Sequence, residues 1–94
     1  MALGSWPPKD PSENLDYNID WTARLAGDTI VTSVWAPLAS GSSLVIGSVY
    51  YISNMTKVWL SGGTLGQTYR LKNTITTAAG ETMVETAELF IKAK

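Results

Sequence analysis

Residues 69–92 read YRLKNTITTAAGETMVETAELFIK and carry the clearest secondary-structure pattern of the chain. Apolar residues alternate with polar ones in two parts of this stretch, Tyr69, Leu71 and Ile75 in the first and Ala87, Leu89 and Ile91 in the second. A period of two is typical of a β-strand with one buried face and one solvated face. Gly80 lies between the two parts and can adopt the positive φ of a tight turn. The stretch therefore predicts a β-hairpin.

Segments of the same kind precede the hairpin. Further strands are predicted at residues 15–21, 29–35, 44–46, 49–52 and 56–60. In the segment 29–35 the apolar residues do not fall on one face, so either both faces are covered or a bulge shifts the register. Gly47 and Ser48 separate the two short strands predicted between residues 44 and 52. About seven short strands, with a turn signal every 8–12 residues, are typical of an all-β sandwich.

The inward-facing positions of these strands predict the core. Large apolar side chains at alternate positions supply most of the burial in a small sandwich. We expect the structural core to contain Trp21, Trp35, Tyr69, Leu71, Ile75, Leu89 and Ile91. No segment has the three-and-four spacing of apolar residues that a long helix needs.

Composition limits the chemistry that is open to the chain. Its 94 residues are the length of one domain, and Lys+Arg 7 against Asp+Glu 8 gives a formal net charge of −1. It has no Cys and no His, so disulfides, thiol chemistry, the usual general base and the usual zinc ligand are excluded. We predict that the protein is not an enzyme and has no cofactor, metal, nucleic-acid partner or membrane partner.

The N-terminal residues differ from the rest. Pro7, Pro8 and Pro11 fall within residues 1–14, and proline favours an extended chain. We predict an extended arm at 1–14, in which Trp6 packs on the domain or on a partner, followed by the sandwich at 15–94. The start lacks the basic and apolar regions of a secretory signal, and no apolar run could span a bilayer. We expect synthesis in the cytoplasm.

Acidic residues are the remaining candidates for chemistry. Five of the eight lie in the first 28 positions: Asp10, Glu13, Asp16, Asp20 and Asp28. Their spacing lacks the loop and closing bidentate Glu of a calcium site, and a small sandwich offers no deep cleft to a glycosidase pair. We interpret Asp16 and Asp20 as part of a solvated strand face. Asp28 is predicted to bind backbone N–H groups in a turn.

The segment Leu65-Gly66-Gln67-Thr68-Tyr69 resembles the corner before one strand of fibronectin type III and related immunoglobulin-like domains. In such a tyrosine corner the phenolic hydroxyl bonds a backbone group a few residues upstream, while the ring packs inward. Leu65 stands where a Pro is usual. Trp35 resembles the core Trp of those domains. The resemblance implies an immunoglobulin-like or fibronectin type III-like β-sandwich, with structural roles for Tyr69 and Trp35.

Further motifs run through residues 9–92. They are Lys9-Asp10-Pro11, Leu15-Asp16-Tyr17, Ile19-Asp20-Trp21, Gly27-Asp28-Thr29-Ile30, Ser33 with Trp35, Val58-Trp59-Leu60-Ser61-Gly62-Gly63, Gly66, Tyr69 and Asn73-Thr74-Ile75-Thr76-Thr77. Their order resembles a family of small immunoglobulin-like proteins of tailed bacteriophages and prophages, such as fibre–tail adaptors and other head or tail accessories. The resemblance implies a virion structural protein and supplies no catalytic residue. Gly80-Glu81 departs from the family, in which a basic residue is expected after the Gly.

The chain carries more large apolar residues than so small a core accommodates. The interface candidates are Trp6, Tyr50, Tyr51, Trp59 and Phe90. Grouped exposed aromatics mark a protein–protein interface or a ligand platform. We predict a phage or prophage virion protein that docks on other virion structural proteins. The alternative is a carbohydrate-binding module in which Trp59, Tyr50 or Tyr51 stacks on sugar rings. Head or tail location and homo-oligomer formation stay open.

Overall fold

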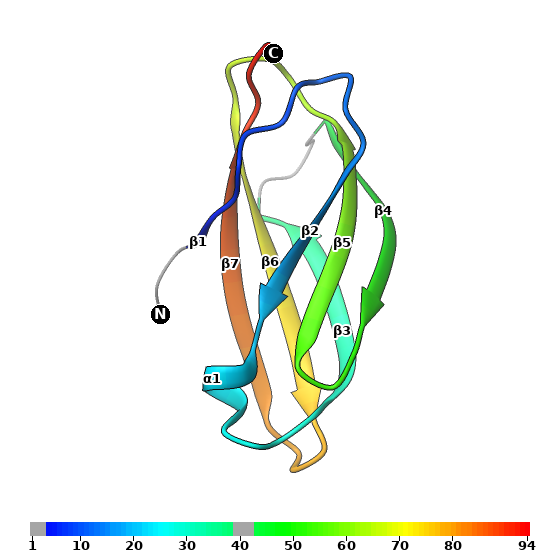
Figure 1. Cartoon of the computed structure of the whole chain (residues 1–94), viewed down its shortest axis with the longest axis vertical. Coiled ribbons are helices and arrows are strands. Elements are labelled where there is room, and N and C mark those ends of the chain that lie inside the picture. The colour runs from blue at the N-terminus through cyan, green and yellow to red at the C-terminus, as the bar shows by residue number, and fades with distance from the viewer. Residues whose placement is uncertain (1–3, 39–42) are drawn as a thin grey trace.

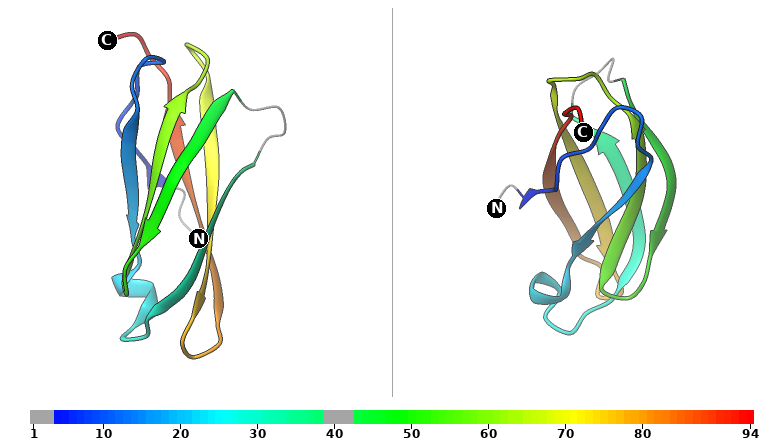
Figure 2. Two further views of the ribbon diagram at one scale, coloured as in Figure 1. Left: turned by 90° about the vertical axis from the view of Figure 1, so that its right-hand side faces the viewer. Right: turned by 45° about the horizontal axis from the view of Figure 1, so that its top comes forward.

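The protein is a sandwich of two β-sheets, seen edge-on in the left view of Figure 2. The structure is a computed structural model, and it describes residues 4–38 and 43–94. In chain order its elements are β1 (Gly4–Ser5), β2 (Leu15–Asp20), α1 (Thr22–Leu25), β3 (Ile30–Pro37), β4 (Leu44–Tyr51), β5 (Met55–Gly62), β6 (Thr68–Thr77) and β7 (Thr82–Phe90) (Figure 1).

One sheet has the strand order β1-β7-β6-β3 and the other β2-β5-β4. Neighbouring strands are antiparallel except β1 and β7, which are parallel. The described residues thus contain seven strands in two layers, which confirms the predicted all-β sandwich. Within the same residues, no helix is long and apolar enough to cross a membrane.

The hairpin predicted from residues 69–92 is formed by β6 and β7. Tyr69 pairs with Leu89 and Ile75 with Met83, so their side chains share the inner face. The turn closes with a 2.9 Å hydrogen bond from the Thr77 N–H to the Glu81 carbonyl, and Gly80 has a φ of 91°. A side chain is strained at that φ, which explains the glycine.

The core fills the space between the sheets. Its main cluster of buried side chains is Tyr17, Trp35, Leu44, Val58, Leu60, Leu71, Leu89 and Ile91, and a second cluster is Trp21, Leu25, Ile30 and Ile75. Tyr69 is only partly buried and packs against the main cluster. The other side chains that were expected in the core are all buried.

A buried polar group joins the two sheets. The Trp21 Nε1–H donates to Thr56 Oγ1 on β5 (3.1 Å) and to Asn73 Oδ1 on β6 (3.2 Å). The Thr56 hydroxyl also donates to Asn73 Oδ1, and the Asn73 amide donates to the Val34 carbonyl on β3. Because buried polar atoms are costly unless hydrogen-bonded, this group favours one register of the two sheets.

Strand β3 contains the register shift that the sequence left open. The pairing with β6 slips between Ile30 and Thr32. As a result, Ile30 and Trp35 are both buried although they are five positions apart, whereas Val31 and Val34 are exposed. A bulge, and not covering of both faces, accounts for the irregular pattern.

The prediction of two short strands around Gly47 and Ser48 is wrong. Residues 44–51 form a single strand, β4, whose pairing with β5 shifts between Ile46 and Val49. A Cβ at Gly47 would lie 3.4 Å from the Trp59 carbonyl oxygen. Gly47 lies at the register shift within a continuous strand, and it is not a turn residue.

The tyrosine corner is present at the start of β6. Tyr69 Oη accepts a 2.7 Å hydrogen bond from the Thr64 N–H, five residues upstream, and lies 2.6 Å from Ser43 Oγ. A Cβ at Gly63 would lie 2.9 Å from two side-chain carbons of Ile91. The corner therefore holds the crossover from β5 to β6 against the end of the core.

The N-terminal segment lies against the sandwich. The Trp6 N–H donates to the Glu88 carbonyl (2.9 Å) and the Lys9 N–H to the Phe90 carbonyl (3.0 Å), so residues 4–9 run along β7. The Trp6 ring stacks on Tyr17 at 4.8 Å between centroids and lies 5.8 Å from Trp35. Its Nε1–H donates to the Asn18 carbonyl at the edge of β2. Trp6 thus bridges the gap between β7 and β2, while a domain boundary at residue 14 stays a prediction.

We expect Trp6→Ala to lower the free energy of unfolding by about 2–3 kcal/mol, somewhat less than for a fully buried Trp. Trp59→Ala is the matched control, because Trp59 is exposed on β5, and its cost should stay below about 1 kcal/mol. Urea unfolding followed by far-UV circular dichroism measures both. Equal losses for the two variants would contradict a bridging role for Trp6.

Candidate functional site

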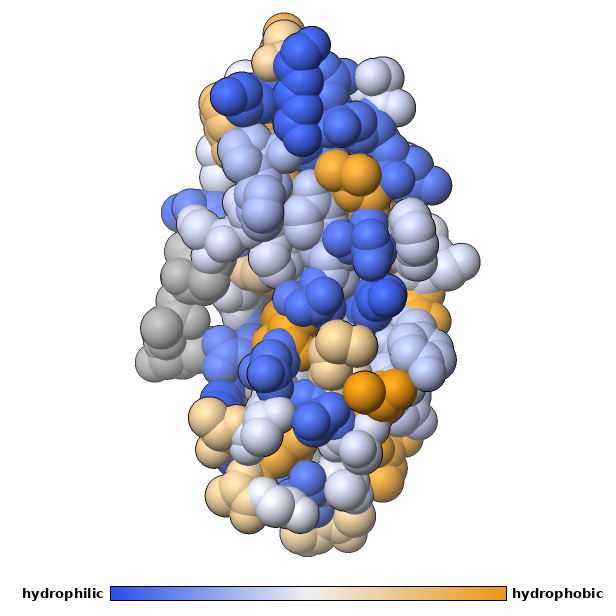
Figure 3. Space-filling model, viewed as in Figure 1, coloured by the Kyte–Doolittle hydropathy of each residue, from blue (hydrophilic) through white to orange (hydrophobic). Residues whose placement is uncertain are grey.

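The five interface candidates do not form one cluster. Tyr50 lies opposite Lys57, and both Tyr50 and Trp59 are on the outer face of the β2-β5-β4 sheet. Figure 3 shows this face, on which hydrophilic side chains cover most of the area. Tyr51 lies opposite the buried Thr56, and its hydroxyl donates to the Val31 carbonyl at 2.6 Å. Phe90 is on the outer face of the other sheet, and Trp6 packs within the domain.

Exposed apolar residues gather around one narrow side of the sandwich instead. Among the residues that the structure describes, eleven large hydrophobic ones are exposed. Eight of them are on β3 and β4 or directly follow these strands: Val31, Val34, Leu38, Val45, Val49, Tyr50, Tyr51 and Ile52. We call these eight residues the β3/β4 side. It faces the viewer in the left view of Figure 2.

This side also lacks charge. No Asp, Glu, Lys or Arg occurs in the sequence between Asp28 and Lys57, an interval that includes all of β3 and β4. Protein interfaces are depleted of charged residues at their centre and enriched in aromatic ones. Sequence reasoning identified Tyr50 and Tyr51 but missed Val31, Val34 and Val49. The uncharged interval is the signal that could have found them.

The opposite narrow side, between β2 and β7, is covered by the chain itself. Besides β1 and Trp6, the Arg24 side chain of α1 donates to the Val84 carbonyl (2.6 Å) and pairs with Glu85 (2.8 Å). These contacts occupy the outer edge of β7. The two narrow sides of the sandwich therefore differ, one being covered from within and the other apolar and exposed.

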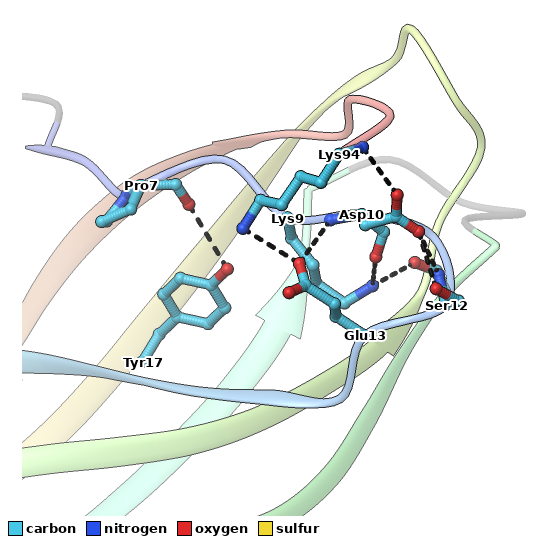
Figure 4. Close-up of polar contacts among 8 residues, drawn as sticks. Pro7, Lys9, Asp10, Ser12, Glu13, Tyr17 and Lys94 are labelled. Carbon is cyan, nitrogen blue, oxygen red and sulfur yellow. Dashed lines mark hydrogen bonds and ion pairs between the residues drawn. The ribbon is translucent and has the colours of Figure 1, made fainter.

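A charged cluster fastens the N-terminal segment near the C-terminal end (Figure 4). Lys9 is completely buried, and its Nζ donates to the carbonyls of Gly62 (2.6 Å) and Asp10 (2.9 Å). Burial lowers the pKa of the Lys9 ammonium, and the carboxylates of Glu13 and Asp10 partly offset this shift. Asp10 Oδ2 accepts the Lys94 N–H at 2.9 Å, and the Lys94 ammonium lies 3.0 Å from Glu13 Oε1.

Both carboxylates of this cluster are occupied by donors of the same chain. Hydrogen bonds from the Ser12 and Lys94 backbone N–H groups and the Ser12 hydroxyl lower the pKa of Asp10 to about 2. The Asp10 N–H donates to Glu13 Oε1 at 2.8 Å and lowers the pKa of Glu13. Throughout residues 4–38 and 43–94, no three acidic residues are grouped as metal ligands. We therefore assign the cluster a structural role and call its residues, Lys9, Asp10, Glu13 and Lys94, the clasp.

The other three acidic residues of the first 28 positions, Asp16, Asp20 and Asp28, also have local partners. Asp16 forms an ion pair with Lys57 (3.4 Å). Asp20 Oδ1 accepts the N–H and the hydroxyl of Thr22, at the start of α1. Asp28 Oδ1 accepts the Thr29 N–H at 2.8 Å, as predicted for a turn residue. Hydrogen bonds from the Thr77 side chain and the Thr29 backbone N–H lower the pKa of Asp28.

The clasp predicts a pH dependence. Because the pKa of Asp10 falls from 3.8 to about 2 on folding, its stabilising effect is complete above about pH 4 and is lost as the pH falls towards 2. Asp10→Asn should lower the urea midpoint at pH 7, and the difference from wild type should shrink steadily as the pH falls from 4 through 2. Glu81→Gln, at an exposed turn position, is the charge-matched control. A difference for Asp10→Asn that does not change with pH would contradict the clasp.

Comparison with known proteins identifies the fold and the family. Among solved structures, the chain is similar to one titled "Solution structure of the PKD domain from KIAA 1837 protein", with a TM-score of 0.59 and 13% identity over 100% of this chain and 91% of that one. This likeness shows an immunoglobulin-like fold. No curated protein matches the sequence. Residues 9–90 match a family model described as podophage GP4 fiber-tail adaptor protein gp77. Since the match spans most of the chain, the protein belongs to the gp77 family of podophage fibre-tail adaptors.

Proposed function

We propose that the protein is a non-enzymatic structural component of a phage virion that docks on another virion protein through the β3/β4 side. The main supporting observation is that the eight exposed apolar residues of this side lie in an uncharged interval of the sequence. The opposite narrow side is covered by the chain's own N-terminal segment. The description of its family as a fibre-tail adaptor supports a location in the tail and a partner among the neighbouring tail proteins.

The physical basis is the removal of apolar surface from water. Val34 and Val45 are 61% and 54% exposed and belong to the outer faces of different sheets, so a partner that covers both must enclose the narrow side between them. Burial of such side chains is favourable by roughly 25 cal/mol per Å² of apolar surface. A rigid sandwich loses little conformational entropy when it docks, which suits an adaptor.

The carbohydrate-binding alternative stays a prediction. Tyr50 and Trp59 share a face of the β2-β5-β4 sheet, as a sugar platform requires. Val31 and Val34 have no place in such a platform, because they belong to β3 in the other sheet. The two functions therefore depend on different residues, and β3 distinguishes them.

The test replaces Val34 or Val45 by Glu in the phage that encodes the protein and measures the copies of the protein per purified particle by mass spectrometry. A buried unpaired carboxylate is costly, and every 1.4 kcal/mol is tenfold in affinity, so each variant should reduce incorporation at least about tenfold. Leu65→Glu is the matched control, because Leu65 is equally exposed but lies at the corner between β5 and β6.

Thermal unfolding of the isolated variants shows whether they fold. Folded Val34→Glu and Val45→Glu proteins that enter particles as fully as Leu65→Glu would overturn the docking assignment. A loss confined to Val45→Glu and to variants of Tyr50 and Trp59 would place the docking surface on the outer face of the β2-β5-β4 sheet and overturn the assignment to the narrow side.

A further inference from the structure

The edges of the sheets differ in how the chain covers them. The outer edge of β7 is paired with β1 and contacted by Arg24, and at the edge of β2 the Asn18 carbonyl accepts from Trp6 Nε1. At the start of β3, the Ile30 N–H donates to the Ser53 carbonyl and the Val31 carbonyl accepts from Tyr51. An uncovered edge presents backbone groups to which another strand can add.

Strand β4 is the open edge. From Val45 to Tyr50, the hydrogen bonds seen in the described structure are those of the ladder with β5. Val45, Val49 and Tyr50 are each more than half exposed. In the middle of β3, Ser33, Trp35 and Ala36 are buried or half-buried, while Thr32 and Val34 are exposed.

The register shows which backbone groups of β4 point outward. The Ile52 N–H donates to the Met55 carbonyl at 2.9 Å, so this is a hydrogen-bonded pair at the end of the ladder. Hydrogen-bonded and non-hydrogen-bonded pairs alternate along antiparallel strands. Tyr50 therefore directs its N–H and C=O towards Lys57 on β5, while Val49 and Tyr51 direct theirs away from β5, towards the open edge.

We propose that β4 accepts an added β-strand from the docking partner, joined through the outward backbone groups of Val49 and Tyr51. This proposal rests on the docking function proposed above. The added segment is extended, uncharged and apolar at alternate positions, because the interval from Asp28 to Lys57 offers no charge with which to pair and Val45, Val49 and Tyr50 offer apolar contacts.

A partner strand suits this edge better than a second copy of β4. The pairing of β4 with β5 shifts between Ile46 and Val49, and such a bulge interrupts the regular edge. Two copies of β4 would bring two bulges together, and bulges on edge strands are a known protection against self-pairing. The straight portion at residues 49–51 remains free for a different segment.

The experiment removes one backbone donor. Val49→Pro deletes the outward N–H, while Tyr50 keeps its bonds to β5, and an edge strand tolerates proline at such a position. Val49→Thr is the control, because it retains the N–H and the branched shape. In purified phage particles, the Pro variant should be reduced at least tenfold and the Thr variant less than threefold. Equal incorporation of the two would overturn strand addition.

Other outcomes separate this proposal from the docking function. If Val34→Glu and Val45→Glu are lost from particles but Val49→Pro is retained, docking stands and strand addition is overturned. If all of these variants are retained, the docking function itself fails. If the isolated wild-type protein sediments as a dimer that Val49→Pro converts to a monomer, the occupant is a second copy and the partner-strand proposal is overturned.

A second measurement applies should Val49→Pro not fold. Hydrogen exchange by mass spectrometry compares the segment 49–52 in the isolated wild-type protein and in purified particles. The proposal predicts at least tenfold slower exchange in particles, because an added strand would bond the amides of Val49 and Tyr51. Unchanged exchange of that segment would overturn it.

Discussion

The packing of Trp6 against Tyr17 and Trp35 is the contact on which the arrangement of this molecule depends. A two-sheet sandwich has two narrow sides at which its apolar interior meets solvent, and a small domain has few residues with which to cover them. Here the ring of Trp6 and the backbone of residues 4–9 cover the side between β2 and β7. The clasp of Lys9, Asp10, Glu13 and Lys94 then holds this segment in place.

The same contact makes the two narrow sides of the sandwich different. Because the N-terminal segment covers one side, most of the large apolar residues that remain exposed in the described structure belong to the other, where β3 and β4 run. Apolar groups on a surface carry a risk of aggregation unless a partner covers them. A member of a fibre-tail adaptor family that exposes such a side has a physical reason to bind a neighbour. The proposed docking role needs no reactive centre, since shape and burial would provide its specificity.

Local patterns explain what the sequence could predict. The β6–β7 hairpin and the tyrosine corner both depend on residues close together in the chain. Alternation and Gly80 were sufficient to find the hairpin, and the segment 65–69 was sufficient to find the corner by its resemblance to fibronectin type III domains. Trp21 and Ile75 followed from the same alternation, whereas Trp35 was expected in the core from the resemblance to immunoglobulin-like domains. The pairing of Gly4 with Ala87 could not be found in this way, because it joins opposite ends of the chain and only two residues of β1 take part. The continuity of β4 was also missed, since Gly47 and Ser48 have the composition of a turn but lie in a bulge beside Trp59.

The candidate site was only half predicted for a related reason. Aromatic residues are conspicuous in a sequence, so Tyr50 and Tyr51 were identified, but so were Trp6 and Phe90, which lie elsewhere. Val31 and Val34 become exposed because the bulge in β3 turns them outward, and the sequence allowed that bulge without requiring it. Which strands form the uncovered side depends on the strand order of both sheets, a property of the whole fold.

Hydroxyl-radical footprinting of the isolated protein and of purified particles tests whether the β3/β4 side is covered by a neighbour in the virion. Tyr50 and Phe90 are both exposed aromatic residues, the first on the β3/β4 side and the second on the outer face of β7. Oxidation of Tyr50 should fall strongly in particles, while oxidation of Phe90 should change little. Protection of Phe90 with Tyr50 still fully reactive would contradict docking through the β3/β4 side.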